Sequence, residues 1–156
     1  MGLPPAPVSQ VDASWIDQGT TSGLGWAFTD TVGQEYEGSR GCRRCLSALH
    51  AEFDGLLWAM ECMKERQYFT TRFQTDCQDL LKMIREPMEW PAFRTELDEF
   101  LELRGSFATF SLSYIPRSLN VRADSLAKGA RARNSIFSHV NFDESVVIIT
   151  TDQLMF

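Results

Sequence analysis

The chain has 156 residues, a length typical of one domain. Hydrophobic residues make up 44% of the sequence and charged residues 23%, a balance that argues against an intrinsically disordered chain. With 15 basic and 21 acidic residues, the formal net charge is −6, which argues against a protein that coats nucleic acid with a uniformly basic surface. A nucleic-acid enzyme stays possible, because metal ions can neutralise clustered carboxylates.

The N-terminal part predicts an antiparallel meander. Residues 1–7 contain three prolines and are expected to be a linker or an edge of the domain. Residues 8–15 and 22–29 have the composition of strands, and the turn residues between them favour a hairpin. After a second turn, residues 34–42 predict the third strand.

Helical periodicity begins near residue 46. Apolar side chains recur every three or four residues over 46–66, and Ser47 is a suitable N-cap for this helix. Aromatic and β-branched residues over 68–75 predict a fourth strand. Shorter helices are predicted at 77–85 and from Pro91, because proline is tolerated in a first helical turn.

A fifth strand at 107–115 and a last helix at 120–133 complete the pattern. Three strands followed by alternating helices and strands predict a mixed α/β fold with helices packed on the faces of a mixed sheet. We expect the domain to occupy residues 8–134. The remaining residues, 135–156, are expected to be a C-terminal extension in which the β-like run at 146–149 adds a strand.

Four acidic residues have apolar neighbours: Asp12 in the first strand, Glu52 on the long helix, Asp76 after the fourth strand and Asp124 early in the last helix. A carboxylate seldom lies in such surroundings unless something pairs with it. Four carboxylates in one place would raise each other's pKa, and a divalent cation would keep them ionised. Ligation by oxygen atoms alone favours Mg²⁺ or Mn²⁺ over zinc, and two such ions about 4 Å apart suit phosphoryl displacement.

Each acid, taken singly, is better explained by an ordinary structural role. Asp124 would interact favourably with a helix N-terminus, and Asp76 would cap the short helix that follows it. Their spacing in the sequence does not show that the four side chains meet.

The four cysteines indicate reduced thiols rather than disulfides. No secretory signal and no run of about 18 apolar residues occur, so we expect an intracellular protein of the nucleus or cytoplasm that has no membrane span. Cys42 and Cys45 form one C-x-x-C motif with His50 nearby, but a structural zinc site needs a fourth ligand. Free thiols near the start of a helix are therefore favoured over zinc.

Short motifs occur in a characteristic order and spacing between residues 8 and 133. They lie at residues 11–15, 23–26, 51–52, 57–60, 75–77, 115–117, 120 and 123–127. Together they resemble the ribonuclease H fold family, and most closely the plant domains related to the C-terminal domain of non-LTR retroelement polyproteins.

This resemblance implies a ribonuclease H-like fold with a five-stranded mixed sheet whose first three strands are antiparallel. It also implies an endonuclease that cleaves the RNA strand of RNA/DNA hybrids and leaves 3′-hydroxyl and 5′-phosphate ends. The acids of the family match Asp12, Glu52, Asp76 and Asp124, which are therefore expected to be catalytic and to bind two Mg²⁺ ions, or Mn²⁺ in their place.

The sequence departs from the family pattern in two places. The loop at 116–120 contains no histidine, which many members use for product release. Residues 86–104, where some members have a basic protrusion, contain six acids and two arginines. Contacts to the hybrid must therefore come from elsewhere in the chain.

Candidate substrate-binding residues precede the long helix and the last helix. Arg43, Arg44 and Ser47 lie before the long helix, and Arg117 and Asn120 lie before the last one. Main-chain groups around Ser47 are candidates for contacts to the 2′-hydroxyl groups that distinguish RNA. The charged residues of the last helix are also explained by a solvated face.

Two other functions fit parts of the same pattern. A noncatalytic module that binds nucleic acid or protein, derived from a retroelement domain, would suit the acidic composition. A 3′–5′ exonuclease of the same fold is disfavoured, because such enzymes have a paired Asp-x-Glu in the first strand and this chain has serine at residue 14. No sequence feature specifies an oligomeric state.

Overall fold

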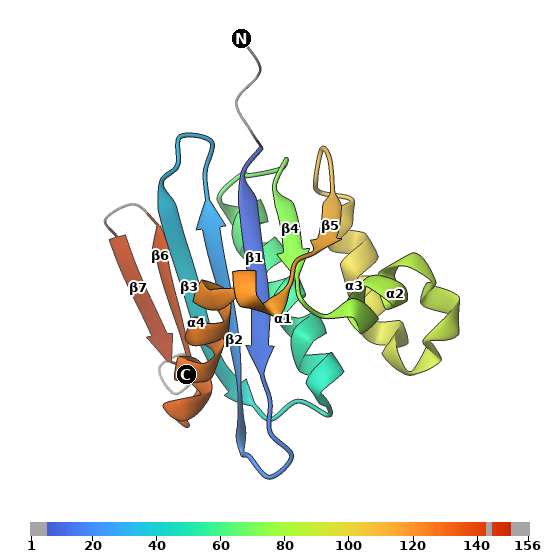
Figure 1. Cartoon of the computed structure of the whole chain (residues 1–156), viewed down its shortest axis with the longest axis vertical. Helices are drawn as coiled ribbons and strands as arrows, with labels where there is room; N and C mark the ends of the chain where they lie inside the picture. The colour runs from blue at the N-terminus through green and yellow to red at the C-terminus, as the bar shows by residue number, and fades with distance from the viewer. Residues whose placement is uncertain (1–5, 143–144, 151–156) are drawn as a thin grey trace.

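The computed structural model describes residues 6–142 and 145–150, which form one mixed sheet flanked by helices (Figure 1). The strands are β1 (Val8–Ser14), β2 (Thr21–Thr29), β3 (Glu35–Arg43), β4 (Arg72–Thr75), β5 (Ser111–Tyr114), β6 (Phe137–Phe142) and β7 (Ser145–Thr150). The helices are α1 (Ala48–Glu65), α2 (Gln78–Arg85), α3 (Arg94–Arg104) and α4 (Val121–Ala132), with short 3₁₀ turns η1 (Pro87–Glu89), η2 (Pro91–Phe93) and η3 (Arg117–Leu119). None of the helices described is long and apolar enough to cross a membrane.

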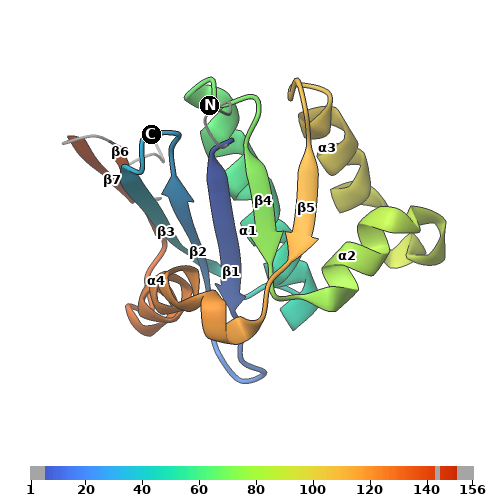
Figure 2. The same ribbon diagram turned by 45° about the horizontal axis from the view of Figure 1, so that its top comes forward.

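The strand order in the sheet is β5-β4-β1-β2-β3-β6-β7. The first three strands pair antiparallel, while β4 runs parallel to β1 and β5 runs parallel to β4. This arrangement confirms the predicted mixed α/β fold. Helix α4 lies on one face of the sheet and α1 on the other, with α2 and α3 beyond the β5 edge (Figure 2).

The sheet contains seven strands rather than the five that were expected. The additional strands come from the C-terminal extension, where β6 pairs with β3 and β7 pairs with β6. The β-like run at 146–149 lies in β7, but β6 was missed because its sequence mixes polar and apolar residues. Phe142 of β6 belongs to the core and packs against Trp26, with their ring centroids 5.4 Å apart.

Several predicted elements are shorter in the structure. Strands β4 and β5 begin later than expected, and a turn hydrogen bond from Thr71 Oγ1 to the carbonyl of Tyr68 precedes β4. The helix expected from Pro91 starts as the 3₁₀ turn η2 before α3 begins. Ser47 caps α1 as predicted, and its Oγ accepts a hydrogen bond from the backbone nitrogen of His50 at 3.1 Å.

Glycines allow both central helices to lie against the sheet backbone. A Cβ at Gly23 of β2 would lie 1.9 Å from the carbonyl oxygen of Ala127, and one at Gly25 would lie 2.6 Å from that of Ala123. On the other face, a Cβ at Gly55 of α1 would lie 3.2 Å from the carbonyl oxygen of Asp12. These close approaches fix where α1 and α4 place their polar residues relative to β1.

We expect Gly23→Ala to destabilise the protein by about 2–4 kcal/mol, because the added methyl group would overlap the backbone of α4. Gly129→Ala is the matched control: a Cβ on Gly129 of α4 would point into open space, and alanine favours a helix. Urea denaturation should show the loss for Gly23→Ala and none for Gly129→Ala. Equal effects of the two changes would contradict the close packing of α4 on β2.

Candidate active site

Three of the four predicted acids meet at one end of the sheet. Asp12 lies in β1, Glu52 in the second turn of α1 and Asp76 directly after β4, and a carboxylate oxygen from each lies within 4.8 Å of the others. The parallel pairing of β1 with β4 brings Asp12 and Asp76 side by side, since Gln10 pairs with Gln74 two residues earlier. The close approach of α1 at Gly55 brings Glu52 to the same place.

Burial and mutual repulsion oppose the ionisation of this group. Burial, followed by the charge of Asp76, raises the pKa of Asp12 to about 7. The pKa of Glu52 is also raised well above its usual value, first by burial and then by the charges of Asp12 and Asp76. The neighbouring Glu52 side chain, in contrast, lowers the pKa of Asp12, whereas the Asp12 side chain raises that of Glu52.

The donor set is suited to a divalent cation. All three side chains offer oxygen ligands, and Glu52 Oε2 is a buried acceptor with no hydrogen-bond donor in the described part of the chain. A bound cation would supply the missing partner and hold the carboxylates ionised. Asp12, Glu52 and Asp76 are thus the residues that would hold a metal ion.

Asp124 lies outside this group of three. It occupies the first turn of α4, and its Oδ2 atom lies 3.0 Å from Lys128 Nζ. Its negative charge still contributes to the raised pKa of Asp12, so it lies near the cluster. The predicted four-carboxylate site is therefore a cluster of three with Asp124 at its margin.

Asn120, which was predicted to bind substrate, is buried and contacts the protein itself. Its Nδ2 atom donates to the carbonyl of Val11 at 2.9 Å and to Asp76 Oδ2 at 3.2 Å. The amide thus connects the start of α4 to β1 and orients one carboxylate of the cluster. The sequence motif before α4 indicates that an asparagine is needed at residue 120. It does not indicate whether the amide side chain is buried or exposed.

Arg117 is exposed in η3 and lies near the cluster. Its positive charge lowers the pKa of Glu52, although more weakly than burial raises it. Because Arg117 is exposed beside the carboxylates, it stays the best-placed candidate for contact with a substrate phosphate.

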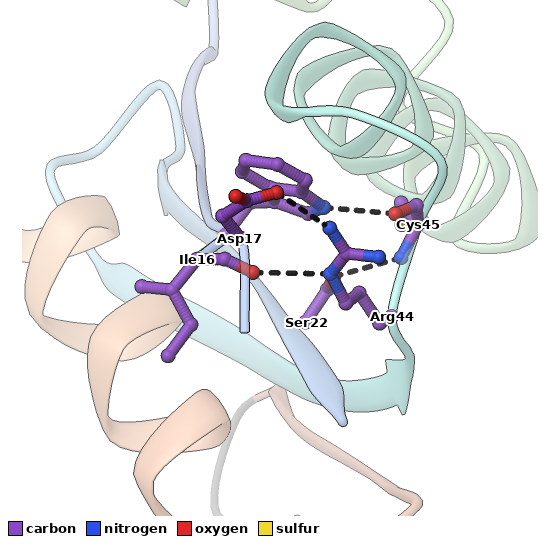
Figure 3. Close-up of polar contacts among 6 residues, drawn as sticks. Ile16, Asp17, Ser22, Arg44 and Cys45 are labelled. Carbon is purple, nitrogen blue, oxygen red and sulfur yellow. Dashed lines mark hydrogen bonds and ion pairs between the residues drawn. The ribbon is translucent and has the colours of Figure 1, made fainter. Parts of the chain in front are cut away.

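Arg44 is held by internal contacts, as Figure 3 shows. Its Nε donates to the carbonyl of Ile16 at 3.1 Å, and its NH2 group lies 3.2 Å from Asp17 Oδ1. The guanidinium also lies 4.7 Å from the ring centroid of Trp15, whose Nε1 donates to the carbonyl of Cys45. Arg44 therefore joins the β1–β2 loop to the β3–α1 linker, a structural role that sequence reasoning missed.

The other candidates, at the end of β3 and just before α1, differ in exposure. Arg43 is exposed and stays a candidate for substrate contact. The Ser47 hydroxyl caps α1 and lies 2.8 Å from His50 Nδ1, so its observed contacts are structural. Cys42 and Cys45 are free thiols, and the three clustered metal-ligand candidates among the described residues do not include them.

In metal-free buffer, we expect the melting temperature to fall as pH rises between about 4 and about 7. The ordinary pKa of an aspartate is 3.8, and burial raises the pKa of Asp12 to about 7, so in this window the folded state keeps a proton that the unfolded chain has lost. The stabilisation by this proton is fully present below pH 3.8 and is lost above about 7. Mg²⁺ at about 100 times its Kd should restore about 2.7 kcal/mol at neutral pH.

Differential scanning fluorimetry with and without Mg²⁺ measures both effects. Asp12→Asn should flatten the pH dependence and remove most of the Mg²⁺ response. Asp79→Asn, which changes an exposed acid in the first turn of α2, should keep both. A melting temperature that increases through this pH window would argue against a buried, protonated acid cluster.

We expect Asn120→Ala to reduce stability by about 1–3 kcal/mol, because it leaves the carbonyl of Val11 without its side-chain donor. Ser118→Ala, an exposed change in the 3₁₀ turn that precedes Asn120, should have little effect. Urea unfolding monitored by tryptophan fluorescence compares the two variants. Equal stabilities would show that the Asn120 amide does not support the site.

Comparisons with known proteins agree with this geometry. A family model described as reverse transcriptase-like matches residues 10–130. A ribonuclease H1 from the halophilic archaeon Halobacterium salinarum superposes with a TM-score of 0.73 at 24% identity, over 81% of this chain and 98% of the other. The ribonuclease H1 called LC11, isolated from compost, gives a TM-score of 0.72 at 18% identity, over 81% and 96% of the two chains.

A third similar structure is the N-terminal ribonuclease H domain of a Mycobacterium tuberculosis protein. Its TM-score is 0.68 at 18% identity, over 80% of this chain and 98% of that one. A search of curated proteins gave no significant match. The family model covers most of the chain and the structural likeness confirms the predicted fold, so the chain belongs to the reverse transcriptase-like family and has the ribonuclease H fold.

Proposed function

We propose that this protein is a metal-dependent endonuclease that hydrolyses the RNA strand of RNA/DNA hybrids. The observation that carries the proposal is the cluster of Asp12, Glu52 and Asp76 on a ribonuclease H fold. A similar structure, that of LC11 ribonuclease H1, was determined in complex with an RNA/DNA hybrid, which supports this substrate class. Its TM-score is 0.68 at 17% identity, over 81% of this chain and 97% of the other.

The three clustered acids would hold Mg²⁺ or Mn²⁺, with Asp124 beside them. When two such ions are bound, they supply an activated water and stabilise the leaving oxygen. The chain's own residues prepare this site: Asn120 keeps Asp76 oriented, and a bound cation would offset the burial and repulsion that raise the pKa of Glu52. Arg117 adds positive charge at the exposed side, where an RNA phosphate would lie.

Basic side chains on α4 already have partners within the protein. Arg122 pairs with Glu35 and Glu37, and Arg131 Nε donates to Ser14 Oγ at 2.7 Å. Lys128 forms an ion pair with Asp124, with Nζ 3.0 Å from Oδ2. We therefore propose that phosphate contacts rest mainly on the exposed Arg43 and Arg117. Two such contacts would give a shallow salt dependence, with a slope of about −2 in log affinity against log salt concentration.

The alternative is a noncatalytic module that binds hybrids or a protein partner. The observation that favours it is the position of Asp124, which pairs with Lys128 and lies outside the cluster of three. An enzyme and a binding module differ in one measurable property, the cleavage of bound RNA.

We expect internal cleavage of the RNA strand in an end-labelled RNA/DNA hybrid with Mg²⁺ or Mn²⁺, and none with EDTA. Asp76→Asn should reduce the rate at least about a hundredfold, which corresponds to about 2.7 kcal/mol of activation free energy. Asp79→Asn changes a nearby exposed acid and should keep the rate. Binding of the hybrid by a folded wild-type protein without cleavage would support the noncatalytic module instead.

We expect Arg117→Ala to weaken hybrid binding and to reduce the salt slope by about one. The control is Arg94→Ala, which removes an exposed arginine on α3 that pairs with Asp98. Arg117→Lys should restore the slope, because it restores the charge. Fluorescence anisotropy over a series of salt concentrations makes the comparison, and an unchanged slope for Arg117→Ala would exclude phosphate contact.

A further inference from the structure

Two cysteines flank the exposed arginines of the β3–α1 linker. Cys42 lies near the end of β3, and Cys45 lies in the linker that leads to α1 (Figure 3). Neither residue belongs to the carboxylate cluster, and the proposed hydrolysis does not use them. Cys45 is nevertheless held in place, because its backbone nitrogen donates to Ser22 Oγ at 3.0 Å and its carbonyl accepts from Trp15 Nε1 at 2.8 Å.

The two thiols are neighbours and have different partners. Both residues lie against Ser22, because the Cys45 backbone nitrogen also contacts the Ser22 side chain, and the proximity of each thiol affects the pKa of the other. The Cys42 thiol donates to the carbonyl of Ser22 at 3.6 Å, whereas Cys45 Sγ lies 3.4 Å from Asp54 Oδ2. Cys42 and Asp54 also line a cavity of about 170 Å³, together with Arg40, which is large enough to admit a molecule of the size of hydrogen peroxide.

The surroundings make one thiol the nucleophile. The neighbouring Cys45 side chain and, more weakly, the positive charge of Arg40 lower the pKa of Cys42. The neighbouring Cys42 side chain and burial raise the pKa of Cys45, whose thiol donates to Asp54 Oδ2 at 3.4 Å and so keeps its proton. Burial raises the pKa of Cys77 to about 11 and the pKa of Cys62 to about 12, which leaves these two thiols unreactive.

We propose that Cys42 and Cys45 are a redox-active dithiol that a hydroperoxide converts into an internal disulfide. The Cys42 thiolate attacks one peroxide oxygen, the O–O bond breaks, and Cys42 becomes a sulfenic acid while hydroxide leaves. The Cys45 sulfur then attacks Cys42, its proton passes to Asp54, and hydroxide leaves as the S–S bond forms. The protons of the two thiols combine with the two hydroxides, so one hydrogen peroxide yields one disulfide and two waters.

Asp54 is suited to receive the proton in the second step. It lies on α1 next to the Cys45 sulfur, and burial raises its pKa above the usual value for an aspartate. Asp54 therefore takes part in the closure of the disulfide and not in the attack of Cys42 on the peroxide. Asp54→Asn should slow closure and let the sulfenic acid accumulate.

The test treats the reduced full-length protein with hydrogen peroxide, blocks the remaining thiols with iodoacetamide and maps the peptides by mass spectrometry. Because trypsin cuts after Arg43 and Arg44, the disulfide should join two separate peptides, and fragment ions assign the link to Cys42 and Cys45. Cys77 should stay alkylated, and Cys42 should react at least about tenfold faster than Cys77. The readout needs no nuclease activity, so it is independent of the proposed function.

Two variants make the result specific. Cys45→Ser should stop the reaction at a sulfenic acid on Cys42, detected with dimedone, while Cys77→Ser should form the disulfide as the wild type does. Absence of the linked peptides from the folded, peroxide-treated wild type would overturn the proposal. Oxidation of Cys77 as fast as Cys42 would also overturn it, because the reaction would then not depend on the surroundings of the motif.

Discussion

Repulsion among three clustered carboxylates, of which Asp12 is buried, is the constraint around which the structure is arranged. Asp12, Glu52 and Asp76 come from a central strand, a helix and the end of a parallel strand, and burial raises the pKa of the first two. Such an arrangement costs folding free energy unless a cation is bound. The rest of the fold must therefore hold the acids together against their own repulsion, which explains why the elements that carry them are packed so tightly.

That packing depends on direct contact between backbones. Gly55 lets α1 lie against β1, and Gly23 and Gly25 let α4 lie against β2 from the opposite face. A side chain at these positions would push the helices outward and separate Glu52 from Asp12. The buried Asn120 adds a polar link between α4, β1 and Asp76. The position of each acid is thus set by main-chain geometry, which changes less than side-chain conformation.

The sequence predicted the clustered acids better than it predicted the roles of the residues around them. The four acids were assigned together by the resemblance, whereas their spacing did not show that they meet. Asp12 and Asp76 lie side by side because residues at the ends of adjacent parallel strands share one edge of a sheet. The pairing of Asp124 with Lys128 was not predictable, since the rotation of a helix on a sheet is decided by tertiary contacts. The structural role of Asn120 follows from its burial, which the sequence did not reveal. Strand β6 was not predicted because its sequence mixes polar and apolar residues, although it completes the core.

The β3–α1 linker connects the proposed chemistry to the rest of the molecule. The exposed Arg43 directly precedes it and lies between the two cysteines in the sequence. Arg44 joins the linker to the β1–β2 loop. It ends at Ser47, which caps α1 five residues before Glu52. Because a helix moves as a rigid unit over one or two turns, a displacement of this cap would be transmitted to Glu52. A disulfide at Cys42 and Cys45 would therefore change the placement of both Arg43, proposed to contact phosphate, and Glu52, proposed to hold a metal ion.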